Sequence, residues 1–200
     1  MAFPSWLPLG LALRDFHDSA ISTQLRVHTN AGTMTPYPPE IFFRNYDDFS
    51  IMDERGCMEA RGRILDVGAG AGAVSLFLQN AMEKEVVALD IAPHCVEIMQ
   101  DLGVQDARAG DVYDVEDEQF DTILLLMNGI GFTGTLSGLD RFLEHAKTLL
   151  RPQGQILFDS SDLRYADIGT ADLRDDKTAY FGEVWYQLEY KGMKGAPYHW

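Results

Sequence analysis

The chain carries the stretch Ile64-Leu65-Asp66-Val67-Gly68-Ala69-Gly70-Ala71-Gly72, in which a short apolar run ends in three alternating glycines. Residues 73–82, which read AVSLFLQNAM, then have the spacing and length of a helix. Glycines at such a turn let the backbone bend sharply and approach a ligand with no Cβ in the way. The stretch therefore predicts a buried strand, a ligand-binding loop and a helix.

The same alternation of apolar runs and helical patterns continues to about residue 161. Apolar runs occupy residues 85–90, 104–108, 120–127 and 155–159, and helical patterns occupy residues 93–102 and 137–150. Apolar runs without strict in–out alternation are typical of parallel strands that helices cover on both faces. The sequence therefore predicts an α/β fold with a three-layer, doubly wound, mostly parallel sheet.

The flanking segments differ from this core in pattern. Residues 1–60 look helical but irregular, and Pro39 could open a helix that continues towards Met58, so we expect an N-terminal helical lid or cap. Residues 61–162 form the predicted core. Residues 163–200 hold an acidic loop and then VWYQLEY at 184–190, which alternates with period two and can turn back at residues 192–195. We expect a β-hairpin there.

Charge limits the classes of partner. The 31 Asp and Glu residues outnumber the 16 Lys and Arg residues, which leaves a formal net charge of −15. Nucleic acids and anionic membrane surfaces both attract basic proteins, so neither is an expected partner. A small molecule, neutral or cationic, fits this charge better.

Cysteine usage and hydropathy bear on location. Cys57 and Cys95 form no CxxC motif and have no paired His ligands nearby, so we expect two reduced thiols and no metal site. The N-terminus lacks the basic region of a signal peptide, and the longest strongly apolar run covers only residues 123–127. These features indicate a cytoplasmic protein.

The glycine loop alone fits two cofactor classes. Gly68, Gly70 and Ala73 satisfy the dinucleotide fingerprint, whereas the alternation up to Gly72 suits S-adenosylmethionine binders. A carboxylate at Asp90, at the end of the next strand, supports a ribose in both classes. Asp66, which lies at the end of the apolar run just before the glycines, suits a ligand with an ammonium group and would repel a pyrophosphate.

Five motifs together indicate a family. They read ILDVGAGAG, VVALDIAP, AGDVYD, FDTILLLMNGIG and LLRPQGQILFD, and they follow one another over residues 63–161. In this order and spacing the chain resembles the class I, Rossmann-like S-adenosylmethionine-dependent methyltransferases of small molecules. The resemblance implies in-line methyl transfer to a small-molecule acceptor, with S-adenosyl-L-homocysteine as product. The alternatives are an NAD(P)-dependent oxidoreductase and a catalytically silent S-adenosylmethionine-binding protein.

The resemblance also implies roles for individual residues, although it identifies no catalytic residue. The methionine end of the cofactor would be held at the first strand, the ribose at the second, the adenine beside the second and third, and the methyl donor near the fourth. An arginine from the N-terminal segment could pair with the cofactor carboxylate. The implied cofactor-binding residues are Asp66, Gly68, Ala69, Gly70, Gly72, Asp90, Ile91, Asp111, Val112, Met127, Asn128 and Arg44.

Chain length adds one expectation. Members of this family usually finish the sheet with a helix and two more strands, the last of them antiparallel. Only 39 residues follow Ser161, and the predicted hairpin occupies the last of them. We therefore expect a C-terminally incomplete sheet that lacks the last two strands, with an uncovered edge through which a homo-oligomer could form.

Overall fold

The computed structural model describes residues 3–20, 24–29, 32–161 and 183–200, which contain a parallel and an antiparallel sheet. The parallel sheet has the order β5-β4-β3-β6-β7 and every neighbouring pair is parallel. Its strands are β3 (Ile64–Val67), β4 (Val86–Asp90), β5 (Ala107–Ala109), β6 (Phe120–Leu125) and β7 (Leu150–Phe158). The five predicted strands are confirmed. Among the described residues the sheet ends at β7, as expected without the last two strands.

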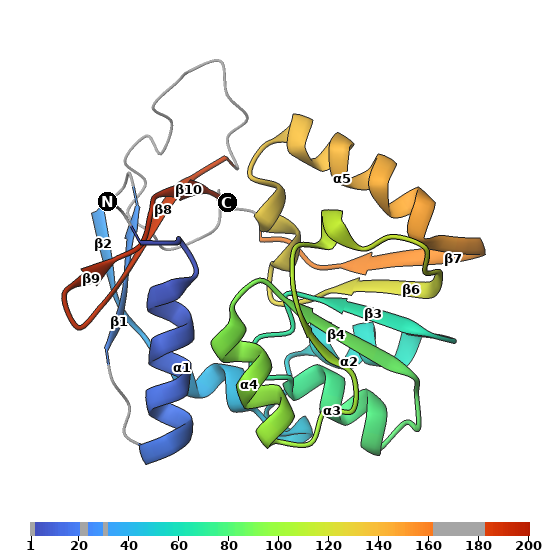
Figure 1. Cartoon of the computed structure of the whole chain (residues 1–200), viewed down its shortest axis with the longest axis horizontal. Coiled ribbons are helices and arrows are strands. Elements are labelled where there is room, and N and C mark those ends of the chain that lie inside the picture. The colour runs from blue at the N-terminus through green and yellow to red at the C-terminus, as the bar shows by residue number, and fades with distance from the viewer. Residues whose placement is uncertain (1–2, 21–23, 30–31, 162–182) are drawn as a thin grey trace.

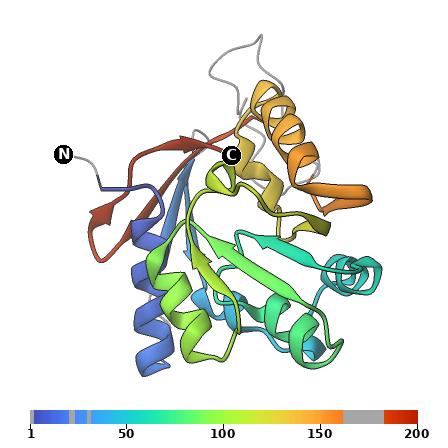
Figure 2. The same cartoon turned by 45° about the vertical axis from the view of Figure 1, so that its right-hand side comes forward.

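Helices cover both faces of this sheet, which confirms the three-layer prediction. The helix α5 (Leu136–Leu149) packs on one face, where Phe142, Ala146 and Leu149 join Leu65 and Ile123 in the largest apolar cluster. The other face carries α2 (Ile51–Glu59), α3 (Ala73–Asn80) and α4 (Pro93–Asp101). Figure 2 shows α5, in orange, on the side of the sheet opposite the green helices α3 and α4.

The second sheet is antiparallel and joins the two ends of the chain. Its strands are β1 (Leu25–Thr29), β2 (Gly32–Tyr37), β8 (Trp185–Tyr190), β9 (Met193–Lys194) and β10 (Tyr198–His199). The strand β1 pairs with both β2 and β8, and β8 pairs in turn with β9 and β10. The predicted C-terminal hairpin is present, since β8 pairs with β10, but β9 lies inside the predicted turn at 192–195 and pairs with β8 as well. These strands belong to a larger sheet that also contains N-terminal strands (Figure 1).

The expectation of helices throughout residues 1–60 needs correction. The helix α1 (Leu7–Ser19) is followed by β1 and β2, then by two 3₁₀ helices, η1 (Pro39–Phe43) and η2 (Tyr46–Asp48), and only then by α2. The backbone is extended at Arg44 and Asn45, which interrupts the continuous helix expected from Pro39 onward. The strand β1 buries Leu25 and Val27, but its partner β8 lies near the other end of the chain, so no local pattern indicated the pairing.

The helix α1 connects the two sheets. It places Ala12 in the apolar cluster of the antiparallel sheet, with Leu25 and Leu188, and it places Leu13 against α4, with Cys95 and Ile98. The carboxyl ends of the parallel strands point towards the antiparallel sheet (Figure 1). The loops after β3 and β6 therefore lie between the two sheets. Within the described part of the chain, no helix has the length and apolar character needed to cross a bilayer.

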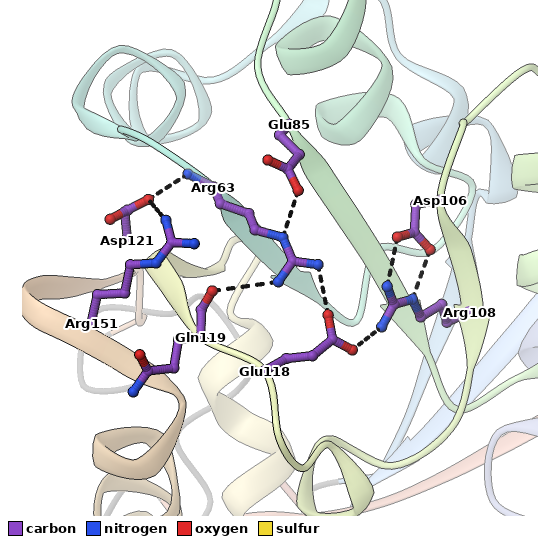
Figure 3. Close-up of polar contacts among 8 residues, drawn as sticks. All are labelled: Arg63, Glu85, Asp106, Arg108, Glu118, Gln119, Asp121 and Arg151. Atoms are coloured by element: carbon purple, nitrogen blue, oxygen red, sulfur yellow. Dashed lines mark hydrogen bonds and ion pairs between the residues drawn. The ribbon is translucent and has the colours of Figure 1, made fainter.

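Charged side chains join the amino ends of the parallel strands, at the edge opposite the glycine loop (Figure 3). Arg63, which precedes β3, donates from Nε to Glu85 and from Nη2 to Glu118, both at 2.6 Å. Glu118 also accepts from Arg108 of β5, whose guanidinium donates to Asp106 as well. Because Glu118 binds two guanidinium groups, it connects the segments that lead into β3 and β6 with β5.

We predict that Glu118→Gln lowers the free energy of unfolding by about 1 kcal/mol, since it removes the charge that two arginines share. Urea denaturation at low salt measures this loss, which should shrink in 1 M NaCl. The matched control is Glu85→Gln, because Glu85 is 69% exposed and binds a single arginine among the described residues. Equal effects of the two variants would show that the network contributes nothing beyond single surface pairs.

Candidate functional site

The turn between β3 and α3 has an unusual backbone conformation. Gly68, Gly70 and Gly72 have φ angles of +74°, +59° and +83°, in the left-handed region that favours glycine. The amides of Gly68 and Ala69 both donate to the carbonyl oxygen of Leu89, at 2.8 and 3.1 Å. The turn is therefore bonded to the neighbouring strand β4 and held in one shape.

The three glycines have different surroundings. A Cβ added to Gly70 would lie 2.9 Å from Cδ1 of Phe42, and one added to Gly72 would lie 2.9 Å from Cγ of Met99. A Cβ added to Gly68 would meet no atom within 4 Å. The backbone of Gly68 thus borders open space, as a cradle for a cofactor requires, whereas the other two glycines allow close packing.

Asp90, at the end of β4, holds the glycine loop in place through hydrogen bonds. Its Oδ2 accepts from the amide of Gly70 at 2.9 Å, and its Oδ1 accepts from the amide of Ala92 at 2.8 Å. The side chain is buried, which raises the pKa of Asp90, while the two amide donors and the Cys95 thiol oppose that rise. Each carboxylate oxygen can accept further bonds, so ribose hydroxyls can bind here.

Asp66, at the end of β3, is a second buried carboxylate. Only 4% of it is exposed, and its Oδ2 accepts from the hydroxyl of Ser75 on α3 at 2.6 Å. Its other oxygen accepts no hydrogen bond from the described residues, which leaves it available to a ligand. Burial, with a smaller effect of the nearby Asp90, raises the pKa of Asp66 to about 6.

The residues predicted to contact adenine follow β4 and β5. Ile91 is 51% exposed although it is a large apolar residue, as a surface for a flat ring requires. Asp111 caps the 3₁₀ helix η3 (Val112–Asp114), since its Oδ1 accepts from the amide of Tyr113 at 3.0 Å. Nε2 of His145 on α5 lies 2.8 Å from the carbonyl oxygen of Val112, so His145 supports this turn from behind.

The turn after β6 is held by the end of β7. Met127 and Asn128 have φ angles of +56° and +59°, which non-glycine residues adopt only when their surroundings impose it. The amide of Asn128 donates to Oδ1 of Asp159 at 2.9 Å, and Ser161 Oγ donates to Oδ1 of Asn128 at 2.9 Å. No local sequence pattern indicates these bonds, because Asn128 and Asp159 are 31 residues apart in the chain.

Arg44 has a different environment from the one expected of a surface arginine. Its Nη1 donates to Oδ2 of Asp53 at 2.9 Å, and the two side chains are only 16% and 3% exposed. Asp53 also accepts from the amide and hydroxyl of Ser50, the N-cap of α2. Sequence reasoning missed Asp53, because nothing local indicated that this acid would be buried. Nε of Arg44 is buried with no hydrogen-bond partner among the described residues.

The structure brings the predicted residues, apart from Arg44, to one edge of the parallel sheet, in the order in which the strands end. Arg44 comes from the segment that also carries Phe42, whose ring lies on the glycine loop. Cys57 and Cys95 are free and buried, as expected. In the described ranges, no group of three or more His, Cys, Asp or Glu side chains is placed to hold a metal ion.

Comparisons with known proteins agree with this geometry. A methyltransferase domain family matches residues 64–154, which span the glycine loop, the parallel strands β3 to β6 and the start of β7. The structure of an S-adenosylmethionine-dependent methyltransferase from Bacteroides fragilis, solved in complex with S-adenosyl-L-homocysteine, superposes with a TM-score of 0.84 at 38% identity. That match covers 100% of this chain and 82% of the other. The chain belongs to the S-adenosylmethionine-dependent methyltransferases.

More distant structures share the fold alone. The CcbJ methyltransferase from Streptomyces caelestis is 13% identical and has a TM-score of 0.60, with 96% of this chain and 80% of that chain covered. A methyltransferase from Clostridium acetobutylicum is 14% identical with a TM-score of 0.53, over 78% of this chain and 73% of that chain. No curated protein matches the chain.

The buried carboxylate of Asp66 should make the free energy of unfolding depend on pH. Its pKa is about 6 in the fold against an ordinary 3.8, so protonation of Asp66 favours the folded state. Below pH 3.8 the carboxyl of Asp66 is protonated in both the folded and the unfolded state, so its burial costs no ionisation energy. As the pH rises through about 6, the folded protein must bury a carboxylate charge, which lowers the free energy of unfolding by about 3 kcal/mol. Asp66→Asn avoids the cost, and we expect its advantage over the wild type to grow by about 2 kcal/mol from pH 4.5 to pH 7.5.

Urea denaturation of the ligand-free protein across this pH range measures the effect. Asp114→Asn, at an exposed carboxylate in η3, is the matched control. A difference between Asp66→Asn and the wild type that stays constant with pH would contradict the assigned cost of the buried charge.

Proposed function

We propose that this chain transfers the methyl group of S-adenosylmethionine to a small-molecule acceptor and releases S-adenosyl-L-homocysteine. One observation carries the proposal: the open backbone at Gly68 lies between two buried strand-end carboxylates, Asp66 and Asp90. An oxygen of Asp66 that accepts no hydrogen bond from the described residues suits an ammonium group and disfavours the pyrophosphate of a nicotinamide cofactor. The relative at 38% identity, solved with S-adenosyl-L-homocysteine, supports the same cofactor.

In this proposal each strand end holds one part of the cofactor. Asp66 binds the methionine end directly or through water, and the glycine loop from Gly68 to Gly72, with Ala69, forms its bed. Asp90 accepts from the ribose hydroxyls and Ile91 packs on the adenine. The remaining contacts come from Asp111 and the Val112 backbone at the adenine amino group, and from Met127 and Asn128 beside the methyl donor.

In this proposal Arg44 takes part through Nε. Nη1 is occupied by Asp53, whereas the N–H at Nε has no partner among the described residues. We place this donor towards the carboxylate of the methionine end, because a buried guanidinium N–H gains from an anionic acceptor.

The reaction requires little acid–base catalysis by the protein. S-adenosylmethionine supplies a methyl group on a sulfonium, from which a neutral thioether leaves. The chain must align the acceptor behind that methyl group and exclude water, and such alignment can lower a barrier by about 7–11 kcal/mol. The bonded turns at Gly68 and Asn128 provide rigid positions on either side of the reacting atoms.

The net charge of −15 supports a neutral or cationic acceptor and no nucleic-acid partner. A cytoplasmic location is part of the same proposal, since two buried free thiols suit a reducing compartment.

Calorimetric titration tests cofactor binding. We expect S-adenosyl-L-homocysteine to bind the wild type and NADH and NADPH not to bind. Asp90→Ala should weaken S-adenosyl-L-homocysteine binding at least 30-fold, or about 2 kcal/mol, because hydrogen bonds to a charged acceptor are lost. Asp114→Ala, which removes an exposed acid from η3, is the control. Unchanged affinity in a folded Asp90→Ala variant would refute the assigned site.

A turnover assay separates an enzyme from a silent binding protein. The wild type, incubated with S-adenosylmethionine and a broad panel of small acceptors, should release S-adenosyl-L-homocysteine with at least one of them. Tight cofactor binding with no release across the panel would favour the silent alternative.

A further inference from the structure

Aromatic side chains gather on the face of the antiparallel sheet that packs against α1. Tyr186 of β8 and Tyr198 of β10 are directly paired across the strands, with ring centroids 6.3 Å apart at 26°. Tyr37, at the end of β2, packs on the same apolar cluster. We call these three residues the tyrosine platform. Two further rings extend it. The ring centroids of Phe42 and Tyr37 are 6.1 Å apart, and those of Trp200 and Tyr198 are 5.9 Å apart.

These two outer rings contact the loops of the parallel sheet. Phe42 lies against Gly70 of the glycine loop, where an added Cβ would come within 2.9 Å of its ring. Trp200 lies against Gly131, in the 3₁₀ helix that follows β6, and a Cβ added there would overlap the indole. The platform therefore extends from the loop that forms the proposed cofactor bed to the loop that borders the methyl donor. An acceptor must lie between these two loops.

The platform hydroxyls form no hydrogen bonds with the part of the chain that the structure describes. None of the three hydroxyls bonds to another described residue, although each side chain is partly buried. Burial raises the pKa of Tyr37, Tyr186 and Tyr198, and neighbouring phenols add to the rise at Tyr37 and Tyr198. The hydroxyls are thus close together and neutral at physiological pH. Partly buried hydroxyls gain from a partner, and a ligand can provide one.

No charged side chain in the described ranges hydrogen-bonds to the platform hydroxyls. Arg44 acts on Tyr37 electrostatically, but its Nη1 is paired with Asp53 and the proposed function assigns its Nε to the cofactor carboxylate. Ring faces stack on flat apolar groups, and neutral phenols can both donate and accept a hydrogen bond. A ligand with a full charge would lose hydration here without gaining an ion pair.

We propose that the tyrosine platform binds the methyl acceptor, and that this acceptor is an uncharged, planar aromatic molecule with a hydroxyl group. The inference rests on the proposed methyltransferase function. In the reaction the acceptor oxygen forms the new bond to the methyl carbon, the carbon–sulfur bond breaks with its electron pair left on sulfur, and the hydroxyl proton leaves to water. The platform residues bind and orient the acceptor; their raised pKa values make them unsuited to accept that proton.

A matched set of ligands tests the class. The probes are 2-naphthol, 2-naphthoate and 2-naphthylmethylammonium, which share one ring system and differ in charge. Each is titrated calorimetrically into the full chain saturated with S-adenosyl-L-homocysteine. We expect 2-naphthol to bind at least tenfold more tightly than either charged probe. Tighter binding of a charged probe, or no binding of 2-naphthol, would overturn the inference.

A matched pair of variants tests the place. Tyr186→Phe/Tyr198→Phe should weaken 2-naphthol about five- to tenfold and leave the affinity for S-adenosyl-L-homocysteine unchanged. Tyr46→Phe removes the same hydroxyl from a ring that stacks on Phe77, away from the platform, and should change neither affinity. Equal effects of the two variants on 2-naphthol would overturn the placement. If S-adenosyl-L-homocysteine itself fails to bind the wild type, the proposed function fails instead.

Discussion

The carboxylate of Asp90 connects most of the parts on which the proposed site depends. It accepts one amide from Gly70 and one from Ala92, so it joins β4, the glycine loop and the start of α4. A buried carboxylate is unfavourable unless donors surround it, and here the backbone provides the donors. Gly70, whose amide donates to Asp90, has a left-handed backbone conformation that favours glycine. The loop shape and the proposed ribose contact thus depend on the same group.

The antiparallel sheet gives the second constraint. Its strands come from both ends of the chain, and α1 connects it to α4 through Leu13. As a result, the aromatic face of this sheet lies opposite the carboxyl ends of the parallel strands. Phe42 and Trp200 then contact the two loops that flank the proposed methyl donor. The acceptor side of the site is therefore formed by residues that are far apart in sequence.

The parallel sheet could be predicted because its signals are local. Each strand is a short apolar run, Asp66 and Asp90 lie at the ends of two of these runs, and the glycine loop directly follows the first. The antiparallel sheet could not be predicted as a whole, because β1 is short and pairs with a strand near the other end of the chain. The same reason applies to the bond from Asn128 to Asp159 and to the pair of Arg44 with Asp53, since a sequence pattern does not show which distant carboxylate a donor meets.

A crystal structure of this protein grown with S-adenosyl-L-homocysteine is the most direct test of the central claim. We predict that the ribose hydroxyls donate to the Asp90 carboxylate, that the adenine lies on Ile91, and that the methionine end lies beside the open backbone of Gly68. A ligand bound elsewhere, with Asp90 contacting only its own loop, would contradict the account.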